Sequence, residues 1–303
     1  MGRARARARR ADRRLAVAAV TRAVTLLAPA KINLALAVTG KRSDGYHELR
    51  SVFATIDLAD RVRVAPNRRL EVRIVPDVGA APGDELASRA VHALAEAIGR
   101  EPAAFVHVRK RIPVAAGLGG GSSDAGAVLR ALARIWRRPD VDLVALAATV
   151  GSDVPFFASG ARVALVSGRG ERVDPLPGLA RTHIVVVRLD ARLQTRDVFA
   201  ALRSEDRGAD GAVVALLDAF SRRGVSGRLL RESARNDLLR AAERLCPAVA
   251  DARSRAAEHG IALSLSGSGP TLFAVADDRP HALRISRALR RIGLAAHAHT
   301  MGG

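Results

Sequence analysis

The chain has 303 residues, which is the length of about two globular domains. Hydrophobic residues make up 49% of it and charged residues 26%, a composition that supplies a core and excludes a mainly disordered or fibrous protein. The formal net charge of +19 favours an anionic partner, either a nucleic acid or a phosphorylated metabolite. The single cysteine, Cys246, excludes an intrachain disulfide and a cysteine-based zinc site. No uninterrupted apolar run approaches the roughly 20 residues of a membrane-spanning helix, so we expect no membrane partner.

The N-terminal segment, residues 1–21, is predicted to be a disordered, arginine-rich tail, because its charge run has no apolar periodicity. A secretory signal is the alternative, with Leu15–Val20 as its apolar stretch and Ala28–Ala30 as its cleavage site. Arg22 interrupts that short stretch, however, and cleavage would cut a motif described below. We therefore expect a cytoplasmic protein.

In the first 180 residues, alternating apolar side chains predict strands and apolar stripes predict helices. The predicted strands are 31–38, 50–57, 61–65, 70–75, 104–109 and 161–166. The predicted helices are 84–98, one that Ser122 and Ser123 open and whose stripe runs from Ala125 to Trp136, and one that Asp140 caps and that runs to about Val150.

A second unit is predicted from about residue 181. Its predicted strands are 183–187, 261–265, 271–276 and 294–299, and its predicted helices are 196–203, 211–222, 236–245, 247–259 and 280–292. Because strands and helices are mixed, with runs of strands early, we predict an α+β protein with domains at 22–180 and 181–303.

A glycine-rich segment at 113–123 follows a predicted strand and opens a predicted helix. Glycines allow positive φ angles and a close approach to a ligand, and successive backbone N–H groups at a helix start attract phosphate. The segment lacks the Gly-Lys-Ser/Thr ending of a Walker loop, and Ser122 stands where a dinucleotide fingerprint has its third glycine. We predict a phosphate cradle; the alternative is a flexible loop with a serine N-cap.

Three motifs in order carry a family resemblance: Pro29–Leu34, the glycine-rich segment, and Leu265–Thr271. With them the chain resembles the GHMP kinase superfamily of small-molecule kinases. The resemblance implies an N-terminal ribosomal-S5-like domain, a C-terminal ferredoxin-like domain, and ATP that arrives with Mg²⁺. It also implies that the nucleotide is bound by Pro113, Val114, Ala115, Ala116, Gly117, Leu118, Gly119, Gly120, Gly121, Ser122 and Ser123.

Three further stretches, Thr39–Leu49, Leu118–Asp124 and Gly151–Phe157, narrow the resemblance within the superfamily. They resemble the kinases of 4-diphosphocytidyl-2-C-methyl-D-erythritol, in the methylerythritol phosphate route to isoprenoids. The resemblance covers roughly residues 24–299. It implies transfer of the ATP γ-phosphoryl group to a hydroxyl of this cytidine diphosphate-linked polyol, a reaction that needs alignment and charge neutralisation.

Lys31 and Asp153 are the predicted catalytic pair. By resemblance Asp153 accepts the proton of the hydroxyl or positions that hydroxyl; a structural aspartate at a helix end is the alternative. Lys31 is one of three lysines among 49 basic residues, and its ammonium can stabilise charge on the transferring group; an exposed lysine is the alternative. Asn33 lies two residues further on the same strand face, so we expect it in the same site, in contact with the substrate.

The other substrate-binding predictions rest on the resemblance. The single tyrosine, Tyr46, is expected to stack on the cytosine, and His47 to hydrogen-bond its edge. Thr195 and Phe199 match the segment with the family's second aromatic residue, with a place in a helix core as the alternative for Phe199. Lys110 matches a substrate-contacting lysine; a solvated strand end is its alternative.

Other functions fit the same residues less well. Homoserine kinase or mevalonate kinase is the alternative within the superfamily, and Tyr46 with His47 discriminates against it, because those substrates have no base to stack. A nucleic-acid-binding protein would fit the charge, but the chain lacks interleaved aromatic residues and an RNA-binding motif. The eight histidines show no zinc spacing, so we predict no metal bound by the protein alone.

Overall fold

The computed structural model describes residues 23–76 and 82–302, so the predicted tail lies outside the described residues. The strands are β1 (Val24–Lys41), β2 (His47–Pro66), β3 (Glu71–Val75), β4 (Ala104–Arg109), β5 (Val163–Gly168), β6 (Arg172–Pro175), β7 (Thr182–Arg188), β8 (Ser264–Leu265), β9 (Leu272–Ala276) and β10 (Ala295–Met301). The helices are α2 (Pro82–Ala97), α3 (Gly120–Ile135), α4 (Leu143–Val150), α5 (Val154–Ser159), α6 (Thr195–Ala200), the short 3-10 helix η1 (Ser204–Asp206), α7 (Gly211–Ser221), α8 (Gly227–Ser233), α9 (Leu239–Leu245), α10 (Pro247–Ala257) and α11 (Arg279–Arg291).

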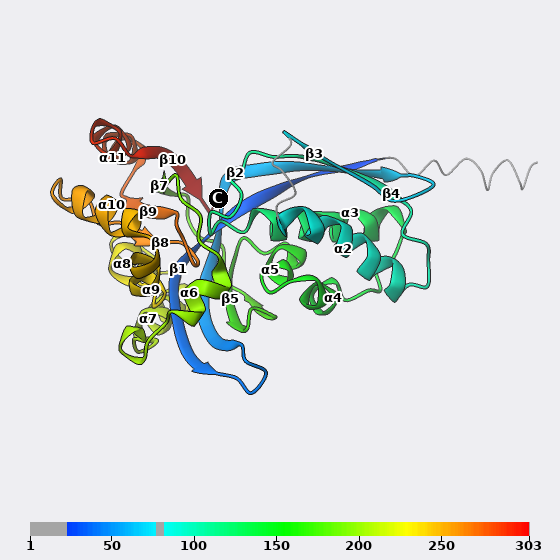
Figure 1. Ribbon diagram of the computed structural model, residues 1–303, viewed down its shortest axis with the longest axis horizontal. Helices are drawn as coiled ribbons and strands as arrows, with labels where there is room; N and C mark the ends of the chain where they lie inside the picture. The colour runs from blue at the N-terminus through cyan, green and yellow to red at the C-terminus, as the bar shows by residue number, and fades with distance from the viewer. Residues whose placement is uncertain (1–22, 77–81, 303) are drawn as a thin grey trace, which may run out of the picture.

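The long strand β2 organises the molecule. One of its edges pairs with β1 over nearly its whole length, while its other edge takes β5, then Met301 of β10 opposite Ile56, and then β4. Figure 1 shows β1 and β2 running from the helices α2–α5 to the helices of the C-terminal half. The sheets of the two halves are therefore continuous through β2.

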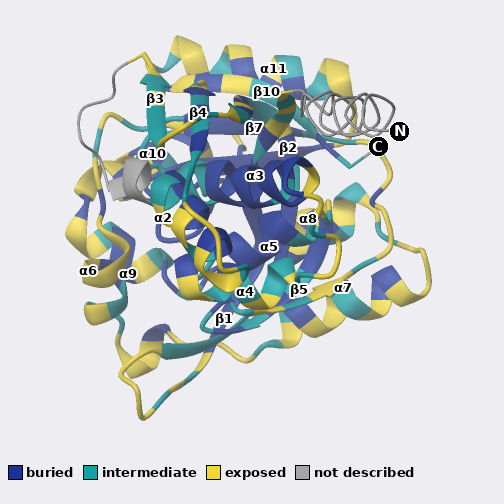
Figure 2. Ribbon diagram, turned by 90° about the vertical axis from the view of Figure 1, so that its right-hand side faces the viewer, coloured by how far each residue is buried: buried dark blue, intermediate teal, exposed yellow. Residues whose placement is uncertain are grey.

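Helix α3 lies at the centre of the N-terminal half. Its predicted apolar stripe is confirmed: Val128, Leu129 and Leu132 have no exposed surface, and they share a core with α2 and with the inner residues of β2 and β4. Figure 2 shows α3 as the darkest, most buried helix of this view. Burial on this scale fixes the N-terminal end of α3, which is the end that carries the glycine-rich segment.

The C-terminal half confirms the expected ferredoxin-like strand order. Its sheet runs β10-β7-β9-β8, which is the order 4-1-3-2 of the strands along the chain. Val185 and Val187 of β7 face the core formed with α9, α10 and α11, whereas Ile184 and Val186 face the core formed with α7 and α8. Alternate side chains of one strand thus hold a helical layer on each face of the sheet.

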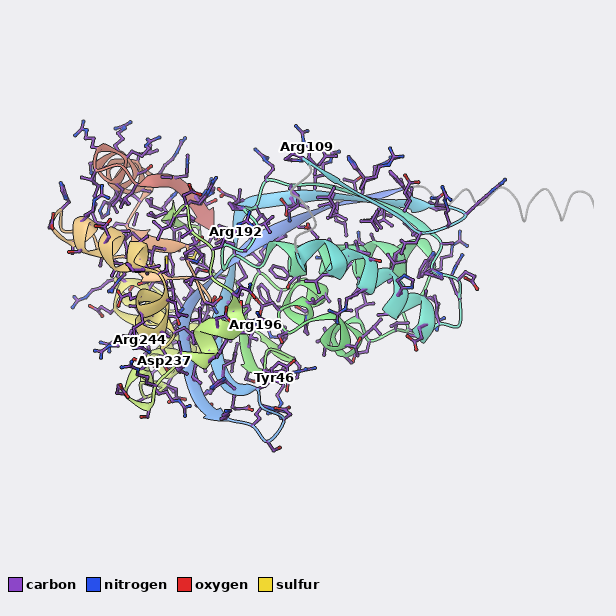
Figure 3. All side chains as sticks on the ribbon, viewed as in Figure 1. Tyr46, Arg109, Arg192, Arg196, Asp237 and Arg244 are labelled. Atoms are coloured by element: carbon purple, nitrogen blue, oxygen red, sulfur yellow. The ribbon has the colours of Figure 1, made fainter. Side chains whose placement is uncertain are left out.

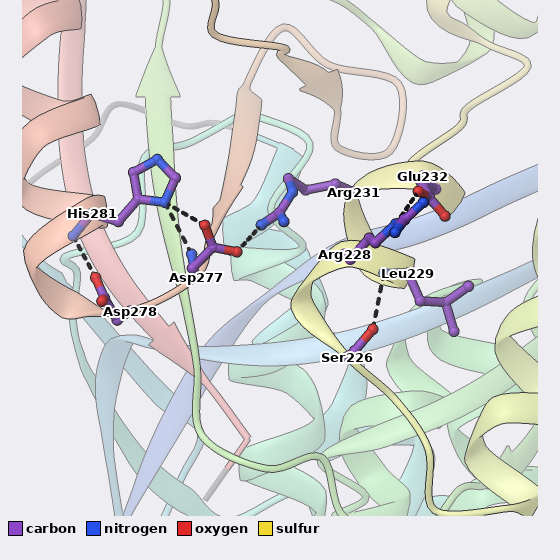
Figure 4. Close-up of polar contacts among 8 residues, drawn as sticks. All are labelled: Ser226, Arg228, Leu229, Arg231, Glu232, Asp277, Asp278 and His281. Atoms are coloured by element: carbon purple, nitrogen blue, oxygen red, sulfur yellow. Dashed lines mark hydrogen bonds and ion pairs between the residues drawn. The ribbon is translucent and has the colours of Figure 1, made fainter.

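Side chains cap the helices that flank β9. Figure 4 shows that Ser226 accepts a hydrogen bond at the start of α8 and that Asp278 does so for His281 at the start of α11. Between them, Asp277 accepts from Arg231 and contacts the His281 ring, and the hydrogen bond from Arg231 lowers the pKa of Asp277. These contacts tie both helices to the end of β9.

Four details of the predicted elements were wrong. The strands 50–57 and 61–65 are one strand, β2. The cap of α4 is Asp142, not Asp140, because it is the Asp142 carboxylate that accepts hydrogen bonds from two backbone N–H groups of the first turn. Helix α3 begins at Gly120, before the two serines, and its N-cap is Gly119. The elements α5, β6 and α8 were not predicted at all.

Candidate active site

Lys31 and Asp153 meet in a cleft between the two halves. Lys31 is buried on β1, and its Nζ lies 3.4 Å from Asp153 Oδ2 and 4.4 Å from the centre of the Phe53 ring. Asp153 stands at the N-cap position of α5, but its carboxylate makes no cap hydrogen bond, so it faces the cleft instead. The side chain of Asp153 is 32% exposed, which leaves it accessible to a ligand.

Asn33 lies beside this pair, as expected from the shared strand face. Its Oδ1 accepts a hydrogen bond of 2.9 Å from Lys31 Nζ. Its Nδ2 donates to Ser51 Oγ, which in turn donates to the carbonyl oxygen of Ala35. This chain of bonds fixes the orientation of the Asn33 amide, so its oxygen holds the ammonium at the base of the cleft.

The glycine-rich segment lies directly against Lys31. The backbone N–H of Lys31 donates to the carbonyl oxygen of Leu118, which fastens the segment to β1. Gly119 has a φ of 70°, and a Cβ atom there would lie 3.1 Å from Lys31 Cγ. Only a glycine allows this conformation and this approach without strain. The start of α3, whose first N–H groups can bind an anion, therefore lies next to the Lys31 side chain.

The loop of the third motif packs over the glycine-rich segment. Ser266 Oγ donates a hydrogen bond of 3.1 Å to the carbonyl oxygen of Gly117, and a Cβ atom on Gly117 would collide with the Ser266 carbonyl oxygen. Asn236 Nδ2 donates to the carbonyl oxygens of Leu265 and Gly267, so it holds this loop in place. These contacts give Asn236 a structural role.

Lys110 belongs to a buried charge cluster under the segment. Its Nζ lies 2.6 Å from Asp60 Oδ2 and 2.7 Å from Asp124 Oδ2. Asp60 also accepts from the backbone N–H groups of Arg111 and Ile112. Burial, partly offset by the Lys110 charge and reinforced by Asp60, raises the pKa of Asp124 to about 7. The cluster joins the end of β4 to the second turn of α3, and no role was predicted for its two carboxylates.

The aromatic residues of the predicted substrate site do not form a stack around Tyr46. The Tyr46 side chain is 50% exposed and lies 5.2 Å from the Arg169 guanidinium; Figure 3 shows it beside the turn between β1 and β2. It is the His47 ring that stacks on Phe199, with ring centres 5.1 Å apart. Burial, followed by the charges of Arg207 and Lys41, lowers the pKa of His47, so the ring is neutral at pH 7.

A cavity of about 520 Å³ joins these parts, a size that suits a small-molecule ligand. Of the predicted site residues it is lined by Lys31, Asn33, Lys110, Pro113, Val114, Ala115, Ala116, Gly117, Gly119, Gly120, Gly121, Ser122, Asp153, Thr195 and Phe199. Leu118, Ser123, Tyr46 and His47 do not line it. Ser123 is buried, and its hydroxyl has no hydrogen-bond partner among the described residues.

Some residues of the site were not predicted from the sequence, among them Phe53, Arg192 and Gln194. Phe53 lies under the Lys31 ammonium, and Arg192 and Gln194 line the cavity. Phe53 lies inside a long apolar strand, and the other two lie just before a predicted helix, so no pattern marked any of them. Within residues 23–76 and 82–302, no group of histidine, cysteine and carboxylate residues could hold a metal ion by itself. The helices of the same residues are too short or too polar to span a bilayer.

Family comparisons agree with the positions of the motifs. The family described as GHMP kinases N terminal domain matches residues 85–161, and the family described as GHMP kinases C terminal matches residues 215–294. The first range holds the glycine-rich segment and Asp153, and the second holds the loop that covers them.

Individual relatives match almost the whole chain. A 4-diphosphocytidyl-2-C-methyl-D-erythritol kinase of Thermus thermophilus is 42% identical over 279 residues, which are 91% of this chain and 96% of the relative. One of Thermobifida fusca is 39% identical, covering 92% and 95%. A crystal structure of a 4-(cytidine 5'-diphospho)-2C-methyl-D-erythritol kinase is 40% identical, with a TM-score of 0.74 over 92% of this chain and 100% of that one. A homoserine kinase of Cytophaga hutchinsonii, with a TM-score of 0.68 and 20% identity, shows the shared fold.

Proposed function

Because the chain belongs to the GHMP kinases, and within them to the 4-diphosphocytidyl-2-C-methyl-D-erythritol kinase family, we propose that it transfers the γ-phosphoryl group of ATP to a hydroxyl of that cytidine diphosphate-linked polyol. The product would serve isoprenoid precursor synthesis. The observation that carries the proposal is the contact of Lys31 with Asp153 next to the glycine-rich segment.

The geometry assigns a part of the reaction to each wall of the cleft. The N–H groups at the start of α3 and the segment before it would hold the phosphates of ATP. Lys31 would neutralise the negative charge that spreads over the transferring group. Asn33 and Phe53 fix the ammonium from two sides, so its position costs little reorganisation during the reaction.

Asp153 would act on the acceptor. Its free carboxylate, close to Lys31, can accept a hydrogen bond from the attacking hydroxyl and take its proton as the new P–O bond forms. The bond between the γ-phosphorus and the bridging oxygen breaks, and ADP leaves. In either role, as proton acceptor or as a group that orients the hydroxyl, Asp153 is placed for this transfer by its contact with the Lys31 ammonium.

The nucleotide would bring Mg²⁺. This ion prefers oxygen ligands and usually binds through phosphates, waters and one or two protein groups. The Ser122 hydroxyl and the Asp153 carboxylate are oxygen donors on the cleft wall, so the cleft fits the ion. When bound, Mg²⁺ would neutralise phosphate charge.

Three acceptors compared side by side test the proposal. ADP release is measured with Mg-ATP and the diphosphocytidyl-methylerythritol, mevalonate or homoserine. We expect turnover of the first acceptor alone. Asp153→Asn should lower kcat by about 10²- to 10⁴-fold, the range for loss of a positioned base. Asp140→Asn is the matched control, because Asp140 pairs with Arg138 on the surface away from the cleft.

The outcomes separate substrate from chemistry. Turnover of mevalonate or homoserine instead would contradict the proposed acceptor, while the assignment as a small-molecule kinase would stand. Full activity of Asp153→Asn with the expected acceptor would contradict the role of Asp153.

A further inference from the structure

The charged residues that line the active-site cavity differ in whether they have an ion-pair partner. They are Lys31, Lys110, Asp153 and Arg192. Lys31 lies against Asp153, and Lys110 lies between two buried carboxylates. Among the residues that the structure describes, Arg192 has neither a hydrogen-bond partner nor an ion-pair partner in the cleft. The cavity therefore carries one uncommitted positive charge, on a side chain that can bind an anion from outside.

Arg192 lies on the part of the cavity wall that the C-terminal half contributes. It belongs to the connection between β7 and α6, as does Leu193, which is buried. Leu193 Cδ1 lies 3.6 Å from where a Cβ atom on Gly269 would sit, so this connection is anchored against the loop over Lys31. Because neighbouring side chains point to opposite sides of an extended segment, the anchored Leu193 leaves Arg192 directed away from the core. Figure 3 shows Arg192 near the junction of the two halves.

The same connection leads to the aromatic side of the cleft. Thr195, at the start of α6, has its Oγ1 3.0 Å from Ser268 Oγ, and Ser268 follows Gly267 beside the Lys31 ammonium. Further along α6, Phe199 stacks with His47. Arg192 is therefore on the wall that runs from the aromatic pair to the catalytic pair.

We propose that Arg192 binds the diphosphate group of the acceptor substrate. This inference rests on the proposed function, in which the acceptor has a base at one end, a reacting polyol at the other and a diphosphate between them. A base against Phe199 and a hydroxyl at Asp153 place the diphosphate along the wall that carries Arg192. The planar guanidinium donates two parallel hydrogen bonds to phosphate oxygens, which an ammonium cannot do. ATP has its own anion-binding groups in the glycine-rich segment and at the start of α3.

Binding of three small molecules to the full chain tests the inference by calorimetry: cytidine 5'-diphosphate, cytidine, and ADP with Mg²⁺. We expect Arg192→Gln to weaken binding of cytidine 5'-diphosphate by about 10- to 100-fold, the usual effect of losing a hydrogen bond between charged groups. Its affinities for cytidine and for ADP should stay within about twofold of the wild-type values. Arg192→Lys should recover part of the loss, because it restores the charge without the fork.

Arg196→Gln is the matched control. Arg196 lies four residues further along the chain, in the first turn of α6, but it is exposed, pairs with Asp197 and does not line the cavity, so its loss should leave all three affinities unchanged. In steady-state assays Arg192→Gln should raise KM for the acceptor and leave KM for ATP unchanged. Since Arg192 is exposed, both variants should keep the wild-type Tm.

Four results would overturn the inference. Unchanged affinity for cytidine 5'-diphosphate in Arg192→Gln would do so while the proposed function stands. An equal loss for cytidine would show a structural effect, and a loss for ADP alone would place Arg192 on the nucleotide. If the wild-type chain bound ADP but showed no preference for cytidine 5'-diphosphate over cytidine and turned over no cytidylated acceptor, the proposed function would fail, and the inference with it.

Discussion

Replacing Asp124 with asparagine should change the way in which the stability of the protein depends on pH. The side chains of Asp60, Lys110 and Asp124 are 0%, 8% and 5% exposed. Two carboxylates share one ammonium there, so one negative charge is in excess in a buried place. Asp60 has two backbone donors besides Lys110, whereas Asp124 Oδ1 has no partner among the described residues. Asp124 is therefore the carboxyl that takes up a proton.

The sign and size of the effect follow from the pKa of about 7 that burial, more than the opposing Lys110 charge, gives Asp124 in the folded protein, against 3.8 as its ordinary value. A raised folded pKa means that the folded state binds the proton more tightly. This contribution to stability is complete below about pH 4 and is lost as the pH rises through about 7. Between pH 5 and pH 8 the free energy of unfolding should fall by about 2 to 3 kcal/mol through this group.

Urea denaturation at pH 5, 6, 7 and 8 measures this change. Asp124→Asn has no proton to lose, and its side-chain oxygen can still accept from Lys110, so its stability relative to the wild type should rise by about 2 to 3 kcal/mol from pH 5 to pH 8. Asp140→Asn is the control. The hydrogen bond from Arg138 lowers the pKa of Asp140 to about 2, so removal of that carboxyl should add no slope in this range.

A difference between wild type and Asp124→Asn that stays constant from pH 5 to pH 8 would refute this reasoning. So would a difference of the opposite sign, with the variant losing stability relative to the wild type as the pH rises. Either result would mean that Asp124 remains ionised beside Lys110 throughout.

Two further expectations concern stability and are measured by the denaturation midpoint. Gly126→Ala should destabilise the protein by about 1 to 3 kcal/mol despite the better helix propensity of alanine, because the new Cβ would lie 2.6 Å from Phe157 Cβ. Gly211→Ala, with nothing within 4 Å of its new Cβ, should be neutral or stabilising, and an equal loss at both glycines would contradict the packing argument. Asp142→Ala should cost about 1 kcal/mol through loss of the α4 cap, and Asp140→Ala much less; the reverse order would restore Asp140 as the cap.

Motifs with strong local chemistry could be predicted from the sequence. The glycine-rich segment is conspicuous because glycines gather where the backbone needs them, and the structure places it between β4 and α3, against Lys31. The family followed from three such motifs in order and the α+β class from the mixture of strands and helices, and the comparisons confirm both. Strand 104–109 was correct to the residue, because its alternation is clean and charged residues follow it from Arg109 onward.

Contacts between distant segments could not be predicted in the same way. Lys110 was expected to meet the substrate or solvent, yet its partner Asp60 lies 50 residues earlier and reaches it through the pairing of β2 with β4. Its role as a substrate contact stays a prediction. The short helix α5, with six residues, shows no periodicity, so the free carboxylate of Asp153 at its start could be recognised only by resemblance.

The loop of the third motif, which packs over the glycine-rich segment, also affects the order in which the parts of the protein fold during synthesis. Ser266 and Gly117, which are joined by a hydrogen bond, are 149 residues apart in the chain, and Met301 pairs with Ile56 across a still longer span. Ribosomes deliver the N-terminal half first, and its core around α3 contains no residue from beyond the first 160. That core can therefore condense early, whereas the cleft closes only when the last third of the chain emerges. A nascent or truncated chain would carry a packed N-terminal core and no complete phosphate site, so it would not consume ATP.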